Sequence, residues 1–242
     1  MGKLDRQVAI ITGASHGLGN GIARGFAHEG ASLVLAARNA EQLSAAAAEF
    51  TALGVEVLAV PTDVQDEEQI EDLFAQAINR FGRLDLLVNN AGVFDSGPLD
   101  ELTTEAWDHV VAVNLRAPFL CTRAAMRIMK PQRQGRIINI GSIAGKRVRP
   151  NTAPYAATKA GLWGLTQVTA LEGREHGITC CCLYPGNIQV DRRLTGMRED
   201  TEPMMAVEEI AQVAVLMASL PPHVEMLEAV VIPHEQLYVG RG

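Results

Sequence analysis

Short apolar runs and longer amphipathic stretches alternate along the whole chain. The apolar runs are rich in valine, isoleucine, leucine and alanine, which is typical of strands buried on both faces. We predict strands at Val8–Thr12, Ser32–Ala36, Val55–Val60, Leu84–Asn89, Arg136–Ile140, Ile178–Leu183 and Ala229–Ile232. The stretches between them have helical spacing, which predicts helices at Leu18–His28, Glu41–Leu53, Glu67–Phe81, Thr104–Leu115, Pro118–Lys130, Tyr155–His176 and Val207–Ser219.

This alternation predicts an α/β fold. Buried strands that are separated by helices pair in parallel through right-handed crossovers. We therefore expect a doubly wound (Rossmann) sheet of about seven strands with helices on both faces, which is a three-layer sandwich. The chain has no linker, composition break or internal repeat, so we interpret residues 1–242 as a single domain.

Composition and charge narrow the class of partner. Of the 242 residues, 48% are hydrophobic and 20% are charged, which is typical of a folded globular protein. The net charge of -7 argues against a nucleic-acid partner or an anionic membrane surface, because both require a basic field. No apolar run approaches the ~20 residues of a membrane span, and the N-terminus has no signal-peptide core. We expect neither a nucleic-acid partner nor a membrane partner.

The four cysteines predict neither disulfides nor a metal site. Cys180, Cys181 and Cys182 are consecutive in a predicted buried strand, and Cys121 falls in a helical stretch. The C-x-x-C and H-x-x-x-H spacings of metal sites are missing from the sequence, so we expect no metal. A reduced, cytoplasmic protein is the expectation.

A glycine-rich turn, Thr12-Gly13-Ala14-Ser15-His16-Gly17-Leu18-Gly19, follows the first predicted strand and leads directly into a helix. The glycines permit positive φ angles and let backbone amides approach a pyrophosphate, which the helix N-terminus also favours. The spacing differs from the better-known G-x-G-x-x-G of dinucleotide sites. The alternative is a plain glycine turn without a ligand.

The end of the second strand indicates which nucleotide would bind. An NAD site has a carboxylate about 20 residues after the glycines, and that position holds Ala37, followed by Arg38. Alanine removes the repulsion that a carboxylate would exert on a 2′-phosphate, and a guanidinium can bind the phosphate. We predict NADP(H), with His16 and Asn39 as candidate helpers. The alternative is that Arg38 is a solvated loop arginine.

Polar and small residues also end the third and fourth predicted strands. Thr62-Asp63-Val64 offers a carboxylate for an adenine amino group, and Asn89-Asn90-Ala91-Gly92 forms a small-residue turn against which a cofactor could lie. Each segment alone is as compatible with a cap or a turn. Their position at the carboxyl ends of successive parallel strands favours cofactor contacts.

Tyr155 and Lys159 are four residues apart, so they share one face of a helix, and Ser142 lies upstream. A free tyrosine titrates near pH ~10, but a cation beside the phenol favours the phenolate. These three side chains form a plausible acid/base unit for a carbonyl or an alcohol. Taken alone, Y-x-x-x-K is as compatible with an exposed helix face.

Asn114 lies four residues before Pro118, which has no N–H. The helix should therefore kink there and leave the Asn114 carbonyl without its helical partner. We interpret that carbonyl as a site for a water molecule that connects Asn114 to Lys159. The alternative is a simple helix break.

Together these motifs resemble the short-chain dehydrogenase/reductase family over nearly the whole chain. The matches, in family order and spacing, are Thr12-Gly13-x-x-x-Gly17-x-Gly19, Asp63, Asn89-Asn90-Ala91-Gly92, Asn114, Ser142, Tyr155-x-x-x-Lys159 and Pro185-Gly186. The resemblance implies hydride transfer on a nicotinamide and four catalytic residues, Asn114, Ser142, Tyr155 and Lys159. By this resemblance Tyr155 is the general acid/base, Ser142 orients the substrate oxygen, and Lys159 binds the nicotinamide ribose.

The resemblance also implies the cofactor site. Pro185, Gly186 and Ile188 fall on the nicotinamide side, and Val190 stands where many family members have threonine. The expected NADP(H) contacts are Gly13, Ser15, His16, Gly17, Leu18, Gly19, Arg38, Asp63, Val64, Asn90, Ala91, Gly92, Tyr155, Lys159, Pro185, Gly186 and Ile188.

The implied activity is NADP(H)-dependent interconversion of a small-molecule carbonyl and a secondary alcohol. The alternatives are a 3-oxoacyl-thioester reductase, a 3-hydroxy acid dehydrogenase, and a non-enzymatic NADPH-binding sensor or scaffold. Lys146, Arg147 and Arg149 would attract an anionic substrate or form a solvated loop. Residues 191–203 are interpreted as a substrate lid or an ordinary surface loop. Family members often pair through the helices that here contain Cys121 and Tyr155, which implies a homodimer or a homotetramer.

Overall fold

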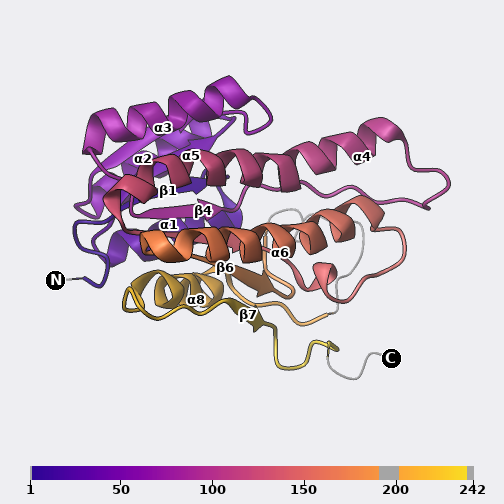
Figure 1. Ribbon diagram of the computed structural model, residues 1–242. Helices are drawn as coiled ribbons and strands as arrows, with labels where there is room; N and C mark the ends of the chain where they lie inside the picture. Colours follow the sequence, from indigo (N-terminus) through magenta and orange to yellow (C-terminus); the bar gives the residue numbers. More distant parts are fainter. Residues whose placement is uncertain (1, 191–201, 239–242) are drawn as a thin grey trace.

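The computed structural model describes residues 2–190 and 202–238 (Figure 1). Its centre is a sheet of seven strands in the order β3-β2-β1-β4-β5-β6-β7, and all neighbouring strands pair in parallel. The strands are β1 Val8–Thr12, β2 Ser32–Ala37, β3 Val57–Pro61, β4 Leu86–Asn89, β5 Gly135–Ile140, β6 Ile178–Pro185 and β7 Glu228–Val231.

Helices cover both faces of this sheet (Figure 1). They are α1 Gly17–His28, α2 Ala40–Ala52, α3 Glu67–Phe81, α4 Thr104–Val111, α5 Ala117–Gln132, α6 Ala153–Gly173 and α8 Val207–Ser219, with short 3₁₀ turns η2 Ile143–Gly145 and η3 Arg174–His176. One hydrophobic core packs α1, α2 and α8 on the sheet, and the other packs α3, α5 and α6 on the opposite face. The predicted doubly wound fold is confirmed.

The ends of α3 show how local sequence sets an element. The Asp66 side chain accepts hydrogen bonds from the Glu68 and Gln69 backbone N–H groups at the first turn, which is a typical N-cap. Gly82 ends the helix in the left-handed region at φ 72°, where glycine is favoured. The predicted bounds of this helix match the observed ones because both caps are local.

The alternative of a simple helix break at Pro118 is wrong. The chain stays helical from α4 into α5 through a π-helical turn, η1 Ala112–Arg116. The Ala117 N–H donates to the Ala112 carbonyl, five residues earlier. A wider turn accommodates the missing N–H of Pro118 without ending the helix, and such π turns are frequent at functional sites.

Buried polar side chains connect the middle of the sheet to two helices. The Asn89 amide of β4 donates to the Asn139 side chain of β5 at 2.8 Å and to the Thr122 hydroxyl of α5 at 3.1 Å. The Asn139 amide in turn donates to the Thr166 hydroxyl of α6 at 2.9 Å. Because these bonds have specific geometry, they fix the positions of α5 and α6 on the sheet more narrowly than apolar packing alone.

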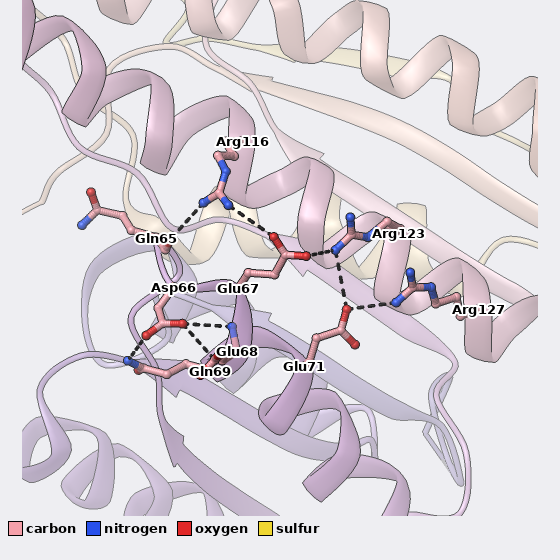
Figure 2. Close-up of polar contacts among 9 residues, drawn as sticks. All are labelled: Gln65, Asp66, Glu67, Glu68, Gln69, Glu71, Arg116, Arg123 and Arg127. Atoms are coloured by element: carbon pink, nitrogen blue, oxygen red, sulfur yellow. Dashed lines mark hydrogen bonds and ion pairs between the residues drawn. The ribbon is translucent and has the colours of Figure 1, made fainter.

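A charged network on the surface connects α3 to η1 and α5 (Figure 2). The Glu67 carboxylate pairs with Arg123 at 2.5 Å and with Arg116 at 3.3 Å, and Glu71 pairs with Arg127 at 3.0 Å. The hydrogen bond from Arg123 lowers the pKa of Glu67 below its ordinary value. Arg116 also donates to the Gln65 carbonyl at 2.9 Å, so the network reaches the turn after β3.

The cysteines are all free and buried, and the three on β6 are part of the sheet interior. Burial raises the pKa of the Cys121 and Cys181 thiols to about 12, so these thiols are poor nucleophiles at neutral pH. None of the helices in residues 2–190 and 202–238 is both long and apolar enough to cross a membrane.

Candidate active site

An open cleft of about 1480 Å³ lies at the carboxyl ends of the central strands, where doubly wound folds bind ligands. The segments that follow β1, β4, β5 and β6 meet there with the first turns of α6. The predicted site residues that line the cleft are Gly13, His16, Gly17, Leu18, Asn90, Ala91, Gly92, Ser142, Tyr155, Lys159, Pro185, Gly186 and Ile188.

Six predicted residues do not line this cleft: Ser15, Gly19, Arg38, Asp63, Val64 and Asn114. Arg38 is exposed directly after β2. The Asp63 carboxylate accepts from the Gln65 backbone N–H at 3.0 Å, and the Val64 side chain packs in a small apolar cluster with Val113 and Ala117. The turn after β3 is therefore held by its own contacts and by η1.

The glycine turn has the conformation that the sequence predicts. Gly13 and Gly17 have φ values of 66° and 58°, in the region that favours glycine. At Gly19 a Cβ atom would lie 2.3 Å from the Gly13 carbonyl oxygen and 2.4 Å from the Asn90 amide nitrogen. Gly19 thus lies outside the cleft but permits the close packing that shapes the turn.

Thr12 and Asn90 tie the glycine turn to the end of β4. The Thr12 hydroxyl oxygen accepts from the Asn90 and Ala91 backbone N–H groups, both at 3.0 Å. The Asn90 amide donates to the Thr12 and Gly13 carbonyls at 2.9 and 3.2 Å. The Asn90 side chain therefore supports the turn.

Tyr155 and Lys159 both face the cleft from α6, as predicted from their spacing. Lys159 is only 5% exposed, and its ammonium donates to the Ile140 carbonyl at 2.7 Å. This ammonium lies 5.7 Å from the centre of the Tyr155 ring. The Phe94 ring packs edge-on against the Tyr155 ring, with 5.1 Å between the ring centres.

Ser142 precedes the η2 turn, and its Oγ accepts from the Ala144 backbone N–H at 3.1 Å. The η2 turn packs closely on α6, since a Cβ atom at Gly145 would lie 2.7 Å from the Lys159 carbonyl carbon. Gly145 thereby permits the close approach of the η2 turn to α6, and Ser142, Tyr155 and Lys159 all line the cleft.

Asn114 acts through its side chain in the described structure. Its amide accepts from the Val93 N–H and donates to the Val93 carbonyl, both at 2.8 Å. A Cβ atom at the neighbouring Gly92 would lie 3.4 Å from the Asn114 Oδ1 and 3.9 Å from the Lys159 ammonium. The π turn therefore holds the segment after β4 beside Lys159, whereas the water relay stays a prediction.

Several cleft residues were missed because no local motif marks them. Gln236 is buried near the C-terminus, and its side-chain oxygen accepts from the Asn187 N–H at 3.0 Å, which supports the segment after β6. Gln236 does not itself line the cleft, whereas Phe94, Leu237 and Tyr238 do. Lys146, in contrast, does not line it: its ammonium pairs with Glu228 at 2.5 Å and lies over the Tyr184 ring.

Comparison with known proteins agrees with this geometry. The family model described as short chain dehydrogenase matches residues 7–201. The chain belongs to the short-chain dehydrogenase family. Members of this family are oxidoreductases that act on carbonyl or CH–OH groups with nicotinamide cofactors.

Individual relatives of this short-chain dehydrogenase cover most of its length. It is 38% identical to a 3-oxoacyl-[acyl-carrier-protein] reductase of Synechocystis sp., over 79% of this chain and 78% of the relative. It is 35% identical to gluconate 5-dehydrogenase of Gluconobacter oxydans, over 87% of each. A metagenomic short-chain oxidoreductase solved in complex with NADP has a TM-score of 0.83 and 35% identity, over 96% of this chain and 98% of that one.

The residues present fit a nicotinamide dinucleotide. The positive φ angles of Gly13 and Gly17 open the turn at the N-terminus of α1, where backbone N–H groups favour a pyrophosphate. The cleft continues from this turn to Tyr155 and Lys159. Within the described residues there is no group of three or more His, Cys, Asp or Glu side chains that could hold a metal ion.

Proposed function

We propose that this short-chain dehydrogenase is an NADP(H)-dependent oxidoreductase that interconverts a carbonyl and a secondary alcohol, with Tyr155 as the acid/base. The observation that carries this proposal is that Tyr155, Lys159 and Ser142 line the same cleft as the glycine turn.

The side chains suggest a division of roles. A bound nicotinamide supplies or accepts the hydride. In reduction the Tyr155 hydroxyl gives its proton to the substrate oxygen, and in oxidation it takes the proton back. Because the Ser142 Oγ accepts from the Ala144 N–H, its own hydrogen is directed to the substrate oxygen. The Lys159 ammonium has three donors, of which one is used by Ile140, so the others serve the ribose and the Tyr155 phenol.

Replacing Tyr155 by phenylalanine tests this proposal. The Tyr155→Phe variant removes the proton donor but keeps the ring, so turnover should fall by at least about 100-fold while the affinity for NADPH changes little. Activity is followed as NADPH consumption with a panel of ketones, oxo acids and quinones, and cofactor binding as thermal stabilisation. Normal rates in this variant would refute the role of Tyr155. Stabilisation of the wild type by NADPH without turnover on the panel would favour the sensor or scaffold.

Two observations support NADP over NAD. Ala37 ends β2 where an NAD site has a carboxylate, and Arg38 is exposed beside it; the metagenomic relative was solved with NADP. An Arg38→Asp variant should lose affinity for NADPH and gain relative affinity for NADH, since the carboxylate repels a 2′-phosphate. Equal kinetics with both cofactors before and after the change would refute the preference.

A second candidate is the reduction of a 3-oxoacyl thioester. It is favoured by the 38% identity to a 3-oxoacyl-[acyl-carrier-protein] reductase. Activity on an acyl-carrier conjugate without activity on small ketones would select it.

We also propose a homodimer or homotetramer that pairs through α5 and α6. A Cβ atom at Gly164 would meet no atom within 4 Å, and Val168 and Leu171 on the same helix are exposed. This exposed stripe of small and apolar residues is typical of a helix that packs against another. Light scattering during size-exclusion chromatography tests it, and a monomer at micromolar concentration would contradict it.

A further inference from the structure

The charged groups that line the cleft have the opposite sign to the chain as a whole. The chain has 28 acidic and 21 basic residues, Lys plus Arg. Among the described residues, however, the lysines, arginines, aspartates and glutamates that line the cleft are only Arg147, Arg149 and Lys159. A cleft lined by cations in an acidic protein concentrates anions.

The two arginines lie away from the place where a cofactor pyrophosphate would bind. The glycine turn follows β1, whereas Arg147 and Arg149 lie on the connection from β5 to α6, between Ser142 and Tyr155. Lys159 is buried and bonded to the Ile140 carbonyl. The arginines are therefore placed to contact a substrate that reacts at Tyr155.

Each of the two arginines has a described contact that orients it. The Arg147 guanidinium lies over the Tyr238 ring, with 5.6 Å to the ring centre, and a cation–π contact of this kind helps to hold the guanidinium in place. Arg149 pairs with Glu202 at 3.2 Å, but both are partly exposed, and pairs of this kind are weak. The Glu202 carboxylate also accepts from the Asn187 amide at 2.7 Å, so Arg149 does not hold this carboxylate alone.

Apolar side chains beside the arginines are open to solvent. Phe94, Val148 and Leu237 line the cleft and are 41%, 73% and 69% exposed. They come from the segment after β4, from the β5–α6 connection and from the C-terminal segment. Exposed apolar side chains that converge on one concave site indicate a ligand with an apolar body.

We propose that the substrate has an apolar body next to its carbonyl or hydroxyl carbon and a separate anionic group, a carboxylate or a phosphate, which Arg147 and Arg149 bind. The proposal rests on the proposed oxidoreductase function, because it assigns the substrate class of the same cleft. Phe94, Val148 and Leu237 cover the apolar body, and the guanidinium groups make charge-assisted hydrogen bonds to the anion.

Matched pairs of compounds test the anionic group. NADPH-dependent reduction is measured for an oxo acid with an alkyl or aryl body and for its methyl ester, in the wild type and in an Arg147→Gln, Arg149→Gln double variant. The wild type should prefer the acid in kcat/KM by about tenfold or more, and the double variant should lose this preference through a higher KM for the acid. An Arg80→Gln control removes a positive charge on α3, outside the cleft, and should keep the preference.

A second pair distinguishes a carboxylate from a phosphate. The coenzyme A thioester of a 3-oxo acid has phosphates, whereas the N-acetylcysteamine thioester of the same acid has none. A preference for the coenzyme A thioester that is lost in the double variant would identify a phosphate as the bound group. A preference for the free acid over its ester that is lost in the same variant would identify a carboxylate.

Calorimetry of binding separates this proposal from the proposed function. Titration of the oxo acid, its ester and both thioesters into the wild type and the double variant, with NADP present, reports anion recognition without turnover. Binding of an anionic member that is at least about tenfold tighter than its neutral partner, and only in the wild type, supports the proposal. The anionic substrate class is wrong if each neutral compound is bound or reduced as well as its anionic partner, or if the preference for the anionic compound survives in the double variant. In either case, turnover that depends on Tyr155 would still support the oxidoreductase function. If no compound is turned over but an anionic one binds through the arginines, the oxidoreductase function fails and the anion site stands.

Discussion

The two ends of the cleft are built in different ways. At the glycine turn the structure depends on backbone groups: positive φ angles at Gly13 and Gly17, a close approach at Gly19, and backbone N–H and carbonyl groups that bond to the Thr12 hydroxyl and the Asn90 amide. At the other end the walls are side chains, such as Phe94, Val148 and Leu237, that come from segments far apart in the sequence and stay partly exposed.

This difference separates what the fold requires from what the substrate requires. Substitutions at the glycine turn collide with backbone or leave N–H groups without acceptors, so they should cost stability and cofactor affinity together. Substitutions at the side-chain end remove partly exposed groups, so they should change activity and leave stability nearly intact. The following predictions test this separation, from the largest expected effect to the smallest.

Gly19→Ala should have the largest effect on stability. Its Cβ atom would lie 2.3 Å from the Gly13 carbonyl oxygen, and because that oxygen belongs to the backbone, the turn must move. We expect a loss of about 3 kcal/mol or more in the free energy of unfolding, together with weaker NADPH binding, measured by urea denaturation and by titration. In a matched control, Gly97→Ala, the Cβ atom would meet no atom within 4 Å. Equal stability of the two variants would contradict the steric argument.

Thr12→Val keeps the shape of the side chain but removes the acceptor for the Asn90 and Ala91 N–H groups. Each N–H group left without an acceptor should cost about 1–3 kcal/mol, visible as a lower urea midpoint at constant slope. Thr51→Val removes a hydroxyl that bonds the Ala47 carbonyl on an exposed helix face and should change stability by less than about 0.5 kcal/mol. A Thr12 variant as stable as the Thr51 control would show that the turn is not held by this hydroxyl.

Phe94→Ala tests the side-chain end. The ring packs edge-on against Tyr155, and such contacts contribute about 0.5–1.5 kcal/mol, so kcat/KM should fall by about two- to tenfold. Because Phe94 is 41% exposed, the unfolding midpoint should hardly change. Leu99→Ala is the control: Leu99 lies on the same connection, is exposed and does not line the cleft. A large loss of stability in the Phe94 variant would remove the distinction between the two ends.

Glu67→Gln, outside the cleft, should have the smallest effect. Its hydrogen bond with Arg123 lowers the pKa of Glu67 below the ordinary value of 4.5, so the stabilisation is present above that pH and is lost as the pH falls through the lowered pKa. The wild type should melt slightly above the variant at pH ~7, and the two should melt together at pH ~3. Glu68→Gln is the control. It removes a carboxylate from the same turn of α3, but Glu68, unlike Glu67, has no arginine partner in the described structure. A difference that persists at the acid pH, or equals that of the Glu68 variant, would contradict the ion pair.

The contrast between the two ends of the cleft also explains which features of the fold and of the site could be predicted from the sequence. The glycine turn and the Tyr155–Lys159 pair were predictable because each depends on residues within one turn or one helix. The alternation of strands and helices predicted the order of elements, and the bounds of α3 were predictable because both of its caps are local. Gln236 was not predictable, because its role depends on the meeting of the C-terminal segment with Asn187.

Other features needed the tertiary structure. Pro118 indicated a disturbance of the helix, but whether the helix breaks or widens depends on the contacts on both of its sides. Here these contacts are the Asn114 side chain with Val93 and the ion pairs of Arg116 and Arg123 with Glu67 of α3. Lys146 and Arg147 are adjacent in the sequence, yet the first pairs with Glu228 and the second faces the cleft. Most of the interpreted lid, residues 191–201, lies outside the described residues.

The π turn η1 also affects which residues of α4 and α5 lie on the same face of the continuous helix that they form. An α-helix advances by about 100° for each residue, and a π turn holds one residue more in each revolution than an α turn. The residues of α5 that share a face with α4 are therefore shifted by one position from those of a regular α-helix. Deleting one residue from η1 would close the wide turn into regular α winding, while α4 and α5 would keep nearly the same orientation because the turn still completes one revolution. The amide of Asn114 would then be carried away from Val93, and the wall beside Lys159 would lose its anchor although every strand of the sheet stayed in place.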